Sequence, residues 1–215
     1  MRSICLINPN TNVATTELMA GLARSMAVPG TFITGMTARS GAALITDPKA
    51  LREAALAVAA LAEQISADGV VVAAFGDPGV AELQRSLRVP VIGIGEAAVR
   101  VAAAGGRRFS IATTTPLLEV SIRANVAALG FAGQLASVRI SRQDPASLTA
   151  DPLELEAVLQ SLVDRCIADD GADAIIIGGG PLSAAARAIS DRVSIPIIEP
   201  VPVAVAWMER LLLKT

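Results

Sequence analysis

The sequence predicts an α/β protein made of two similar, doubly wound, parallel four-stranded units related by pseudo-twofold symmetry. The stretches Val70–Val80 and Ala174–Ser183 each begin with an apolar run and stop in a glycine and proline turn. An uninterrupted run of Val, Ile and Ala between breakers is typical of a strand buried on both faces of a parallel sheet. Strands and amphipathic helices alternate along the chain, which favours parallel sheets with right-handed crossovers.

An internal repeat supports two units. Ile4–Ile7 matches Phe109–Ala112 at an offset of 105 residues, and Val89–Ile92 matches Ile195–Ile198 at an offset of 106. The predicted halves are residues 1–104 and 105–215, with the C-terminal helix as a candidate addition to the first. Ligands of open α/β sheets bind beyond the carboxyl ends of the strands, so we expect one site between the halves.

In the first half, runs of β-forming residues predict strands, and leucine and alanine at helical spacing predict helices. Asp47-Pro48 and Asp77-Pro78 each join a capping carboxylate to a proline at the first helical position, which predicts a helix start. Asn10 is expected to cap the helix after the first strand. The predicted order is strand Ser3–Ile7, helix Asn12–Met26, strand Thr31–Thr37, loop Ala38–Thr46, helix Pro48–Ser66, strand Gly69–Ala74, helix Pro78–Leu87, strand Val89–Ile92 and helix Glu96–Ala104.

The second half restates this order. Thr115-Pro116, Asp151-Pro152 and the region of Pro181 are expected to open helices in the same way. The predicted order is strand Phe109–Ala112, helix Pro116–Leu129, strand Gln134–Ile140, polar loop Ser141–Ala150, helix Pro152–Ala168, strand Asp173–Ile177, a helix ending at Ile189, strand Ile195–Ile198 and helix Val201–Leu213.

Composition excludes several classes of function. The chain has no histidine and no tyrosine, so a histidine-containing metal site or catalytic triad is ruled out, and no metal site is expected. Net charge is −2 with scattered arginines, which argues against a nucleic-acid partner. No long uncharged apolar stretch or signal-peptide pattern is present, so we expect no membrane partner and a cytoplasmic location. Cys5 and Cys166 are expected to be buried free thiols.

Three motifs carry a family resemblance. They are Leu6–Thr11 (LINPNT), Ala73–Gly79 (AAFGDPG) and Phe109–Thr114 (FSIATT). Together they resemble the hydantoin/allantoin racemase branch of the aspartate/glutamate racemase superfamily over nearly the whole chain. The resemblance implies the duplicated fold, an isomerase-type activity without a cofactor, and a small substrate that carries a carboxylate or an imide-like carbonyl.

The chain departs from that family at two positions. The resemblance places a catalytic cysteine at the end of each central strand, where one thiolate removes a proton and the opposite thiol returns one. Here these positions are Ala74 and Gly179. Two-thiol racemisation is therefore expected to be lost. Glu96 and Glu199 follow the fourth strand of each half and are the remaining acid/base candidates, although each could be a solvated or capping carboxylate.

The substrate-binding candidates follow the central strands. They are Asn8, Pro9, Asn10, Thr11, Phe75, Gly76, Thr113, Thr114, Thr115 and Gly180. A cluster of asparagine and threonine at a helix N-terminus suits an anionic oxygen, and the turn after Gly178 could present backbone N–H groups to a carboxylate. The alternative is that these residues only form turns and caps. Asp77 is expected to be an N-cap rather than a catalyst.

The function predicted is a cofactor-independent, racemase-like protein that binds a small carboxylate or hydantoin-type ligand. A decarboxylase or lyase with a dioxyanion pocket, a non-catalytic binding protein, and an engineered cysteine-less racemase are the alternatives. The apolar C-terminal stretch Val201–Leu213, with Trp207, predicts a homo-oligomer because it holds too many apolar groups for a free terminus.

Overall fold

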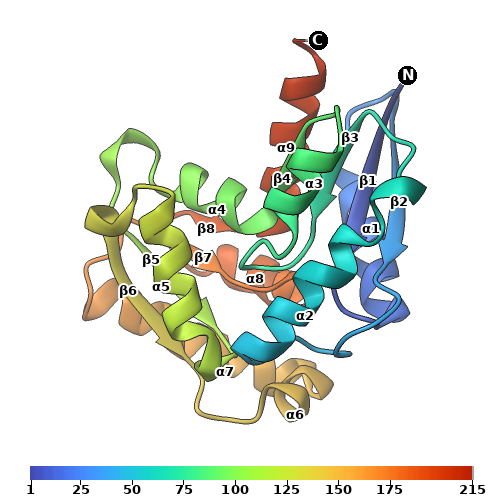
Figure 1. Cartoon of the computed structure of the whole chain (residues 1–215). Helices are drawn as coiled ribbons and strands as arrows, with labels where there is room; N and C mark the ends of the chain where they lie inside the picture. The colour runs from blue at the N-terminus through green and yellow to red at the C-terminus, as the bar shows by residue number, and fades with distance from the viewer. Residues whose placement is uncertain (215) are drawn as a thin grey trace. The chain divides into compact units, whose positions relative to one another are not determined.

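The structure is a computed structural model that describes residues 1–214. The chain forms two compact units, Met1–Ala97 with Val201–Thr215, and Ala98–Pro200. Figure 1 shows the regular alternation of strands and helices along the chain. Each unit contains a four-stranded, all-parallel sheet, in the orders β2-β1-β3-β4 and β6-β5-β7-β8. Flanking helices complete the α/β fold that the sequence predicts.

The first unit carries the first four strands and the C-terminal helix. Its elements are β1 Arg2–Asn8, α1 Val13–Met26, β2 Thr31–Thr37, α2 Pro48–Ala59, the 3-10 turn Ala62–Gln64, β3 Gly69–Val72, α3 Val80–Ser86, β4 Val91–Gly93, the start of α4 Ile94–Ala102, and α9 Pro200–Leu212 from Val201 on.

The second unit repeats this plan. After the end of α4, its elements are the 3-10 turn Ala104–Gly106, β5 Phe109–Thr113, the turn Pro116–Leu118, α5 Glu119–Ala128, the turn Ala132–Gln134, β6 Leu135–Ile140, α6 Pro145–Ala150, α7 Pro152–Ala168, β7 Ala174–Ile177, the turn Gly180–Leu182, α8 Ser183–Ser190 and β8 Ile197–Ile198.

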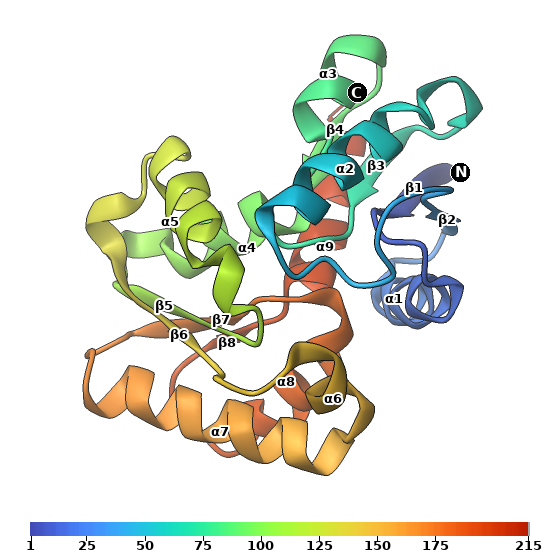
Figure 2. The same ribbon diagram turned by 60° about the horizontal axis from the view of Figure 1, so that its bottom comes forward.

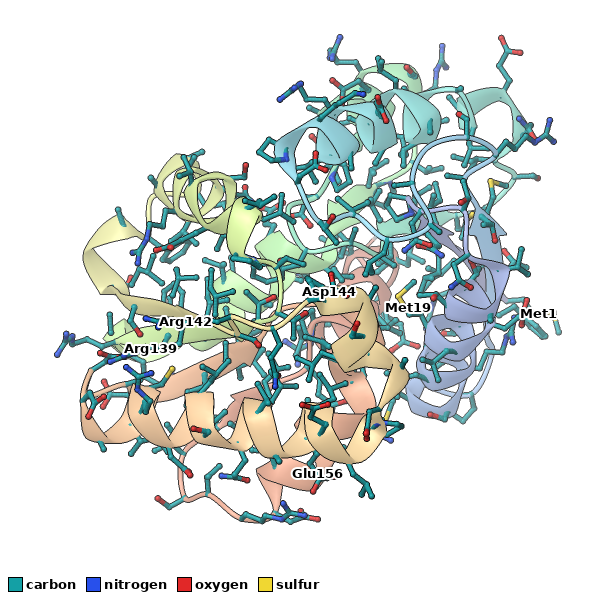
Figure 3. All side chains as sticks on the ribbon, turned by 90° about the horizontal axis from the view of Figure 1, so that it is seen from below. Met1, Met19, Arg139, Arg142, Asp144 and Glu156 are labelled. Carbon is teal, nitrogen blue, oxygen red and sulfur yellow. The ribbon has the colours of Figure 1, made fainter. Side chains whose placement is uncertain are left out.

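Alternate residues of the first sheet pack into two separate hydrophobic cores. Ile4 and Leu6 of β1 pack in a cluster with residues of α1, α4 and α9, including Met19, which Figure 3 labels. Cys5 and Ile7 of the same strand pack in the other cluster, with residues of α2 and α3. Because successive side chains of a strand point to opposite faces, this division means that helices cover both faces of the sheet.

The second sheet is covered in the same manner. Ala112, Ile175 and Ile177 pack in one cluster with the buried leucines of α7 and with Ile189 of α8. Figure 2 shows α7 and α8 on that face of the sheet and α5 on the other.

The internal repeat is visible in the hydrogen bonds. The backbone N–H of Asp68 donates to the carbonyl of Ser3, and that of Asp173 donates to the carbonyl of Arg108. In each pair the aspartate carboxylate also accepts the backbone N–H of its partner. Both members of one pair lie 105 residues after those of the other, the offset that the strand sequences predict.

Several predicted boundaries and caps were wrong. The helix predicted to reach Ser66 ends at Ala59, before a 3-10 turn. The loop predicted over Ser141–Ala150 contains α6, because Asp144, labelled in Figure 3, caps it next to a proline at its first position.

Two other caps differ from their predictions. The cap of α1 is Asn12, not Asn10, since the Asn12 side chain accepts from the backbone N–H of Thr15. The N-cap of α3 is Gly79, in the left-handed region, so α3 begins at Val80 rather than at Pro78.

Helix α9 completes the core of the first unit. Val201, Ala204, Val205 and Met208 are buried there, and Trp207 is partly buried against the same cluster. The apolar residues of α9 therefore pack within their own unit. The homo-oligomer that these residues predicted is not tested by this packing and stays a prediction. Among residues 1–214 no helix is both long enough and apolar enough to span a membrane.

Candidate functional site

A buried polar network follows β1. Asn8 is fully buried, and its Nδ2 donates to Asn10 Oδ1 at 2.9 Å, to the Asn12 carbonyl at 3.0 Å and to Thr16 Oγ1 at 3.0 Å. The hydroxyls of Thr16 and Thr37 lie 2.7 Å apart. The turn between β1 and α1 is therefore held from the edge strand β2 as well as from its own helix.

Asn10 is the member of this network that is left with a free donor. Its exposed fraction is 7%, and its Oδ1 accepts from Asn8 Nδ2 and from the Asn12 backbone N–H at 3.0 Å. Within residues 1–214, its own Nδ2 has no hydrogen-bond partner. This nitrogen is not among the side-chain atoms that are fully buried without a partner, so it is accessible and can donate to a ligand oxygen.

The end of β3 lies beside this turn. β1 and β3 are neighbours in the sheet, and the Ala73 backbone N–H donates to the Ile7 carbonyl at 2.7 Å. Ala74, Phe75 and Gly76 follow as a half-buried turn. The first unit thus brings Asn8–Thr11 and Ala74–Gly76 to one edge of its sheet.

Asp77 is a helix cap, but for a distant helix. Its Oδ1 accepts from the Gly95 backbone N–H at 2.7 Å, and its Oδ2 accepts from the Glu96 backbone N–H at 2.6 Å. The carboxylate therefore caps the first turn of α4 and not α3, which corrects the partner assumed from the sequence.

Two glycines make room for this carboxylate. A Cβ at Gly93 would lie 2.1 Å from Asp77 Cγ, and one at Gly95 would lie 2.9 Å from Oδ2. Sequence reasoning missed these two glycines, although a Gly-x-Gly directly after a strand was a usable signal.

The second unit has a comparable arrangement after β5 and β7. Thr113 Oγ1 donates to the Gly178 carbonyl at 2.7 Å, and the Gly178 backbone N–H donates to the Ala112 carbonyl at 2.9 Å. Thr114 has an exposed fraction of 4%, and its hydroxyl bonds to none of the residues that the structure describes. Thr115 makes no side-chain cap, which removes the capping alternative for this residue. Thr113–Thr115 and Gly178–Gly180 thus share one edge of the second sheet.

Gly179 adopts a backbone conformation that favours glycine. Its φ is +148° and its ψ is +127°. A Cβ at this position would lie 3.2 Å from Leu182 Cγ and Cδ1. A cysteine here would therefore be strained as well as crowded.

The remaining acid/base candidates have partners of their own. Glu199, with a side chain 18% exposed, pairs with Arg187 at 3.3 Å. Glu96 is half-buried at the capped start of α4. Glu199 is thus ion-paired rather than solvated, and the acid/base role of both carboxylates stays a prediction.

The two thiols lie inside cores rather than at strand ends. Burial raises the pKa of the Cys5 thiol, in the middle of β1, to about 11. Burial also raises the pKa of Cys166 on α7, which contacts Ser110 and Ser137. Ser137 in turn donates to Asp170, which pairs with Arg139, labelled in Figure 3. Among residues 1–214 no group of three or more acidic or cysteine side chains is placed to hold a metal ion.

Comparisons with known proteins agree on one family. The family model for Asp/Glu/Hydantoin racemase matches residues 4–208. A hydantoin racemase from Paenarthrobacter aurescens is 29% identical over 97% of this chain and 90% of its own length. The structure of an allantoin racemase from Klebsiella pneumoniae is 32% identical with a TM-score of 0.91, covering all of this chain and 89% of the other. That of an allantoin racemase from Pseudomonas fluorescens is 31% identical with a TM-score of 0.94, covering 99% and 91%.

Proposed function

Because the chain belongs to the Asp/Glu/hydantoin racemase family, we propose that it binds a small carboxylate or hydantoin-type ligand at its strand ends, without a cofactor and without two-thiol racemisation. Relatives named hydantoin racemase and allantoin racemase support this ligand class. Both substrates contain a five-membered ring whose carbonyl oxygens accept hydrogen bonds, as do the oxygens of a carboxylate.

The observation that carries the binding proposal is Asn10 Nδ2, which has no hydrogen-bond partner among residues 1–214 and belongs to a residue that is 7% exposed. The hydroxyl of Thr114, which also has no hydrogen-bond partner among residues 1–214, follows the equivalent strand of the other unit. Donors kept free of protein partners at strand ends favour a ligand with acceptor oxygens, because open α/β sheets bind their ligands beyond these ends.

The loss of racemisation rests on what stands at positions 74 and 179. Racemisation through opposite faces of one carbon needs a base and an acid, each within about 3–3.5 Å of its target. Ala74 offers a methyl group and Gly179 a hydrogen atom, so neither can exchange a proton. Cys5 and Cys166 are buried in the two cores and keep raised pKa values, so they are poor substitutes for thiolates at strand ends.

The binding test is a thermal-shift titration with hydantoin, allantoin, aspartate, glutamate and malonate. A ligand at 100 times its Kd stabilises the native state by about 2.7 kcal/mol, which raises the melting temperature by about 5–11 °C for a chain of this size. We expect at least one of these compounds to give such a concentration-dependent rise. No rise with any of them would refute the binding proposal.

The chemistry is tested separately in deuterated solvent. Each enantiomer of allantoin, a 5-substituted hydantoin, aspartate and glutamate is incubated with the protein and followed by chiral chromatography and mass spectrometry. We expect no inversion and no deuterium at the stereocentre above the buffer control. Rapid inversion with α-deuteration would contradict the loss of racemisation. Release of CO₂ from a malonate incubated in parallel would instead favour the decarboxylase alternative.

A further inference from the structure

The turn after β1 fixes which end of the Asn10 amide faces a ligand. We propose that Asn8 is a positioning residue that holds Asn10 as a hydrogen-bond donor, so that the site takes a carbonyl or carboxylate oxygen at this point and disfavours an N–H group. This inference rests on the proposed function, because it assigns the polarity of the same site.

Two backbone groups determine the orientation of the Asn8 amide. Asn8 Oδ1 accepts from the Asn10 backbone N–H at 3.2 Å, and Asn8 Nδ2 donates to the Asn12 carbonyl at 3.0 Å. A backbone N–H can only donate and a carbonyl can only accept. Rotating the Asn8 amide by 180° would set donor against donor and acceptor against acceptor, in a side chain with no exposed surface.

Asn8 passes this orientation on to Asn10. The Nδ2 of Asn8 donates to Asn10 Oδ1 at 2.9 Å, and the Asn12 backbone N–H donates to the same oxygen at 3.0 Å. Two donors therefore hold the oxygen of Asn10, and its Nδ2 is left on the other side. An amide N–H₂ carries hydrogens to donate and no acceptor, so it selects an oxygen over an N–H.

Neighbouring contacts keep the turn in place. The Thr11 backbone N–H donates to the Ala42 carbonyl at 3.1 Å, and Asn12 caps α1. Thr16 is a third acceptor for Asn8 Nδ2, which has two hydrogens for three acceptors. Removing the Thr16 hydroxyl would leave Asn8 with two acceptors for two hydrogens, so Thr16→Val serves as a matched control that disturbs the network but leaves the polarity of Asn10 unchanged.

The experiment is a double-mutant cycle on ligand affinity, measured by isothermal titration calorimetry with whichever of hydantoin, allantoin, aspartate, glutamate and malonate stabilises the unmodified protein best. Asn10→Asp keeps the shape of the side chain but replaces the donor with an acceptor, so we expect Kd to rise by about tenfold or more, as loss of a hydrogen bond to an anionic oxygen requires. We expect Asn8→Leu to raise Kd about fivefold or more, which corresponds to the cost of one lost hydrogen bond. Thr16→Val should leave Kd within about twofold, because it does not change the orientation of Asn10.

The cycle separates positioning from general loss of structure. If Asn8 acts through Asn10, Asn8→Leu added to Asn10→Ala should not weaken binding further, although it lowers the melting temperature in both backgrounds. Additive losses of affinity, or an Asn10→Asp variant that binds as well as the unmodified protein, would overturn the inference while leaving the proposed function intact. An unmodified protein that binds none of these five compounds would overturn both.

Discussion

Restoring a thiol at position 179 should cost stability, whereas restoring one at position 74 should not. Gly179 has φ +148°, and an added Cβ would lie 3.2 Å from two atoms of Leu182. Holding an ordinary residue in such a backbone region costs about 1–3 kcal/mol. With about 2–4 °C per kcal/mol for a chain of this length, Gly179→Ala should lower the melting temperature by about 2–12 °C. Ala74 is half-buried and has no positive φ, so Ala74→Cys should change it little.

Glycine-to-alanine variants at two other positions of the same unit serve as controls for the stability loss in Gly179→Ala. Gly130 has φ +86° with nothing within 4 Å of an added Cβ, so Gly130→Ala should lose about 1–2 kcal/mol from the backbone alone. Gly133 has open space and no positive φ, and Gly133→Ala should be neutral or slightly stabilising. Gly179→Ala should exceed Gly130→Ala because of the contact with Leu182.

Urea unfolding followed by circular dichroism measures these differences. Circular dichroism is needed because the single tryptophan, Trp207, lies in the first unit and the glycines lie in the second. A Gly179→Ala variant as stable as the Gly133→Ala variant would refute the reasoning. Gly179→Cys should share the loss of stability seen in Gly179→Ala, and the Ala74→Cys and Gly179→Cys double variant should recover some racemase activity only if the rest of the pocket is still family-like.

Three further predictions can be checked with the same material. Asp77→Asn should destabilise the protein by about 1–3 kcal/mol in urea, because an amide can accept from only one of the two N–H groups that start α4; an unchanged midpoint would contradict the capping role. The pKa of Cys5 is raised from 9.0 to about 11, so the neutral thiol contributes to the free energy of unfolding in full below pH 9. That free energy should fall by about 2–3 kcal/mol between pH 9 and 11. That alkaline loss should shrink in Cys5→Ala, and an identical pH profile for the two proteins would argue against it. The predicted homo-oligomer should give a scattering mass of at least twice 21.9 kDa, and a monodisperse monomer would rule it out.

The duplicated fold could be predicted because it depends on local patterns. The apolar runs around Val71 and Ile176 end in breakers, and their flanking sequences repeat at an offset of 105 or 106 residues, so the strands and their order along the chain follow from the sequence. The structure confirms this even in single hydrogen bonds, such as those between Ser3 and Asp68.

The details of the candidate site could not be predicted, because they depend on partners that are distant in the sequence. Asp77 looks like a local cap next to a proline, yet its carboxylate reaches a helix 18 residues further on. The polarity of Asn10 depends on Asn8, whose own orientation depends on which backbone groups surround it once β1 and α1 are packed. The hydroxyl of Thr37 joins this network from β2, which no spacing in the sequence indicates.

The place of α9 in the first unit affects the order in which the chain can fold during synthesis. Residues 98–200 are contiguous, so the second unit has all of its residues before α9 is made. The first unit lacks α9 until then. The face of its sheet that Val201, Ala204 and Met208 later cover is therefore still open to solvent. Gly69 lies so close to Met208 that an added Cβ would reach its sulfur at 2.5 Å, so no side chain at that position can shield the face in the meantime. The first unit is thus completed after the second, and its apolar face is exposed to aggregation until α9 is made.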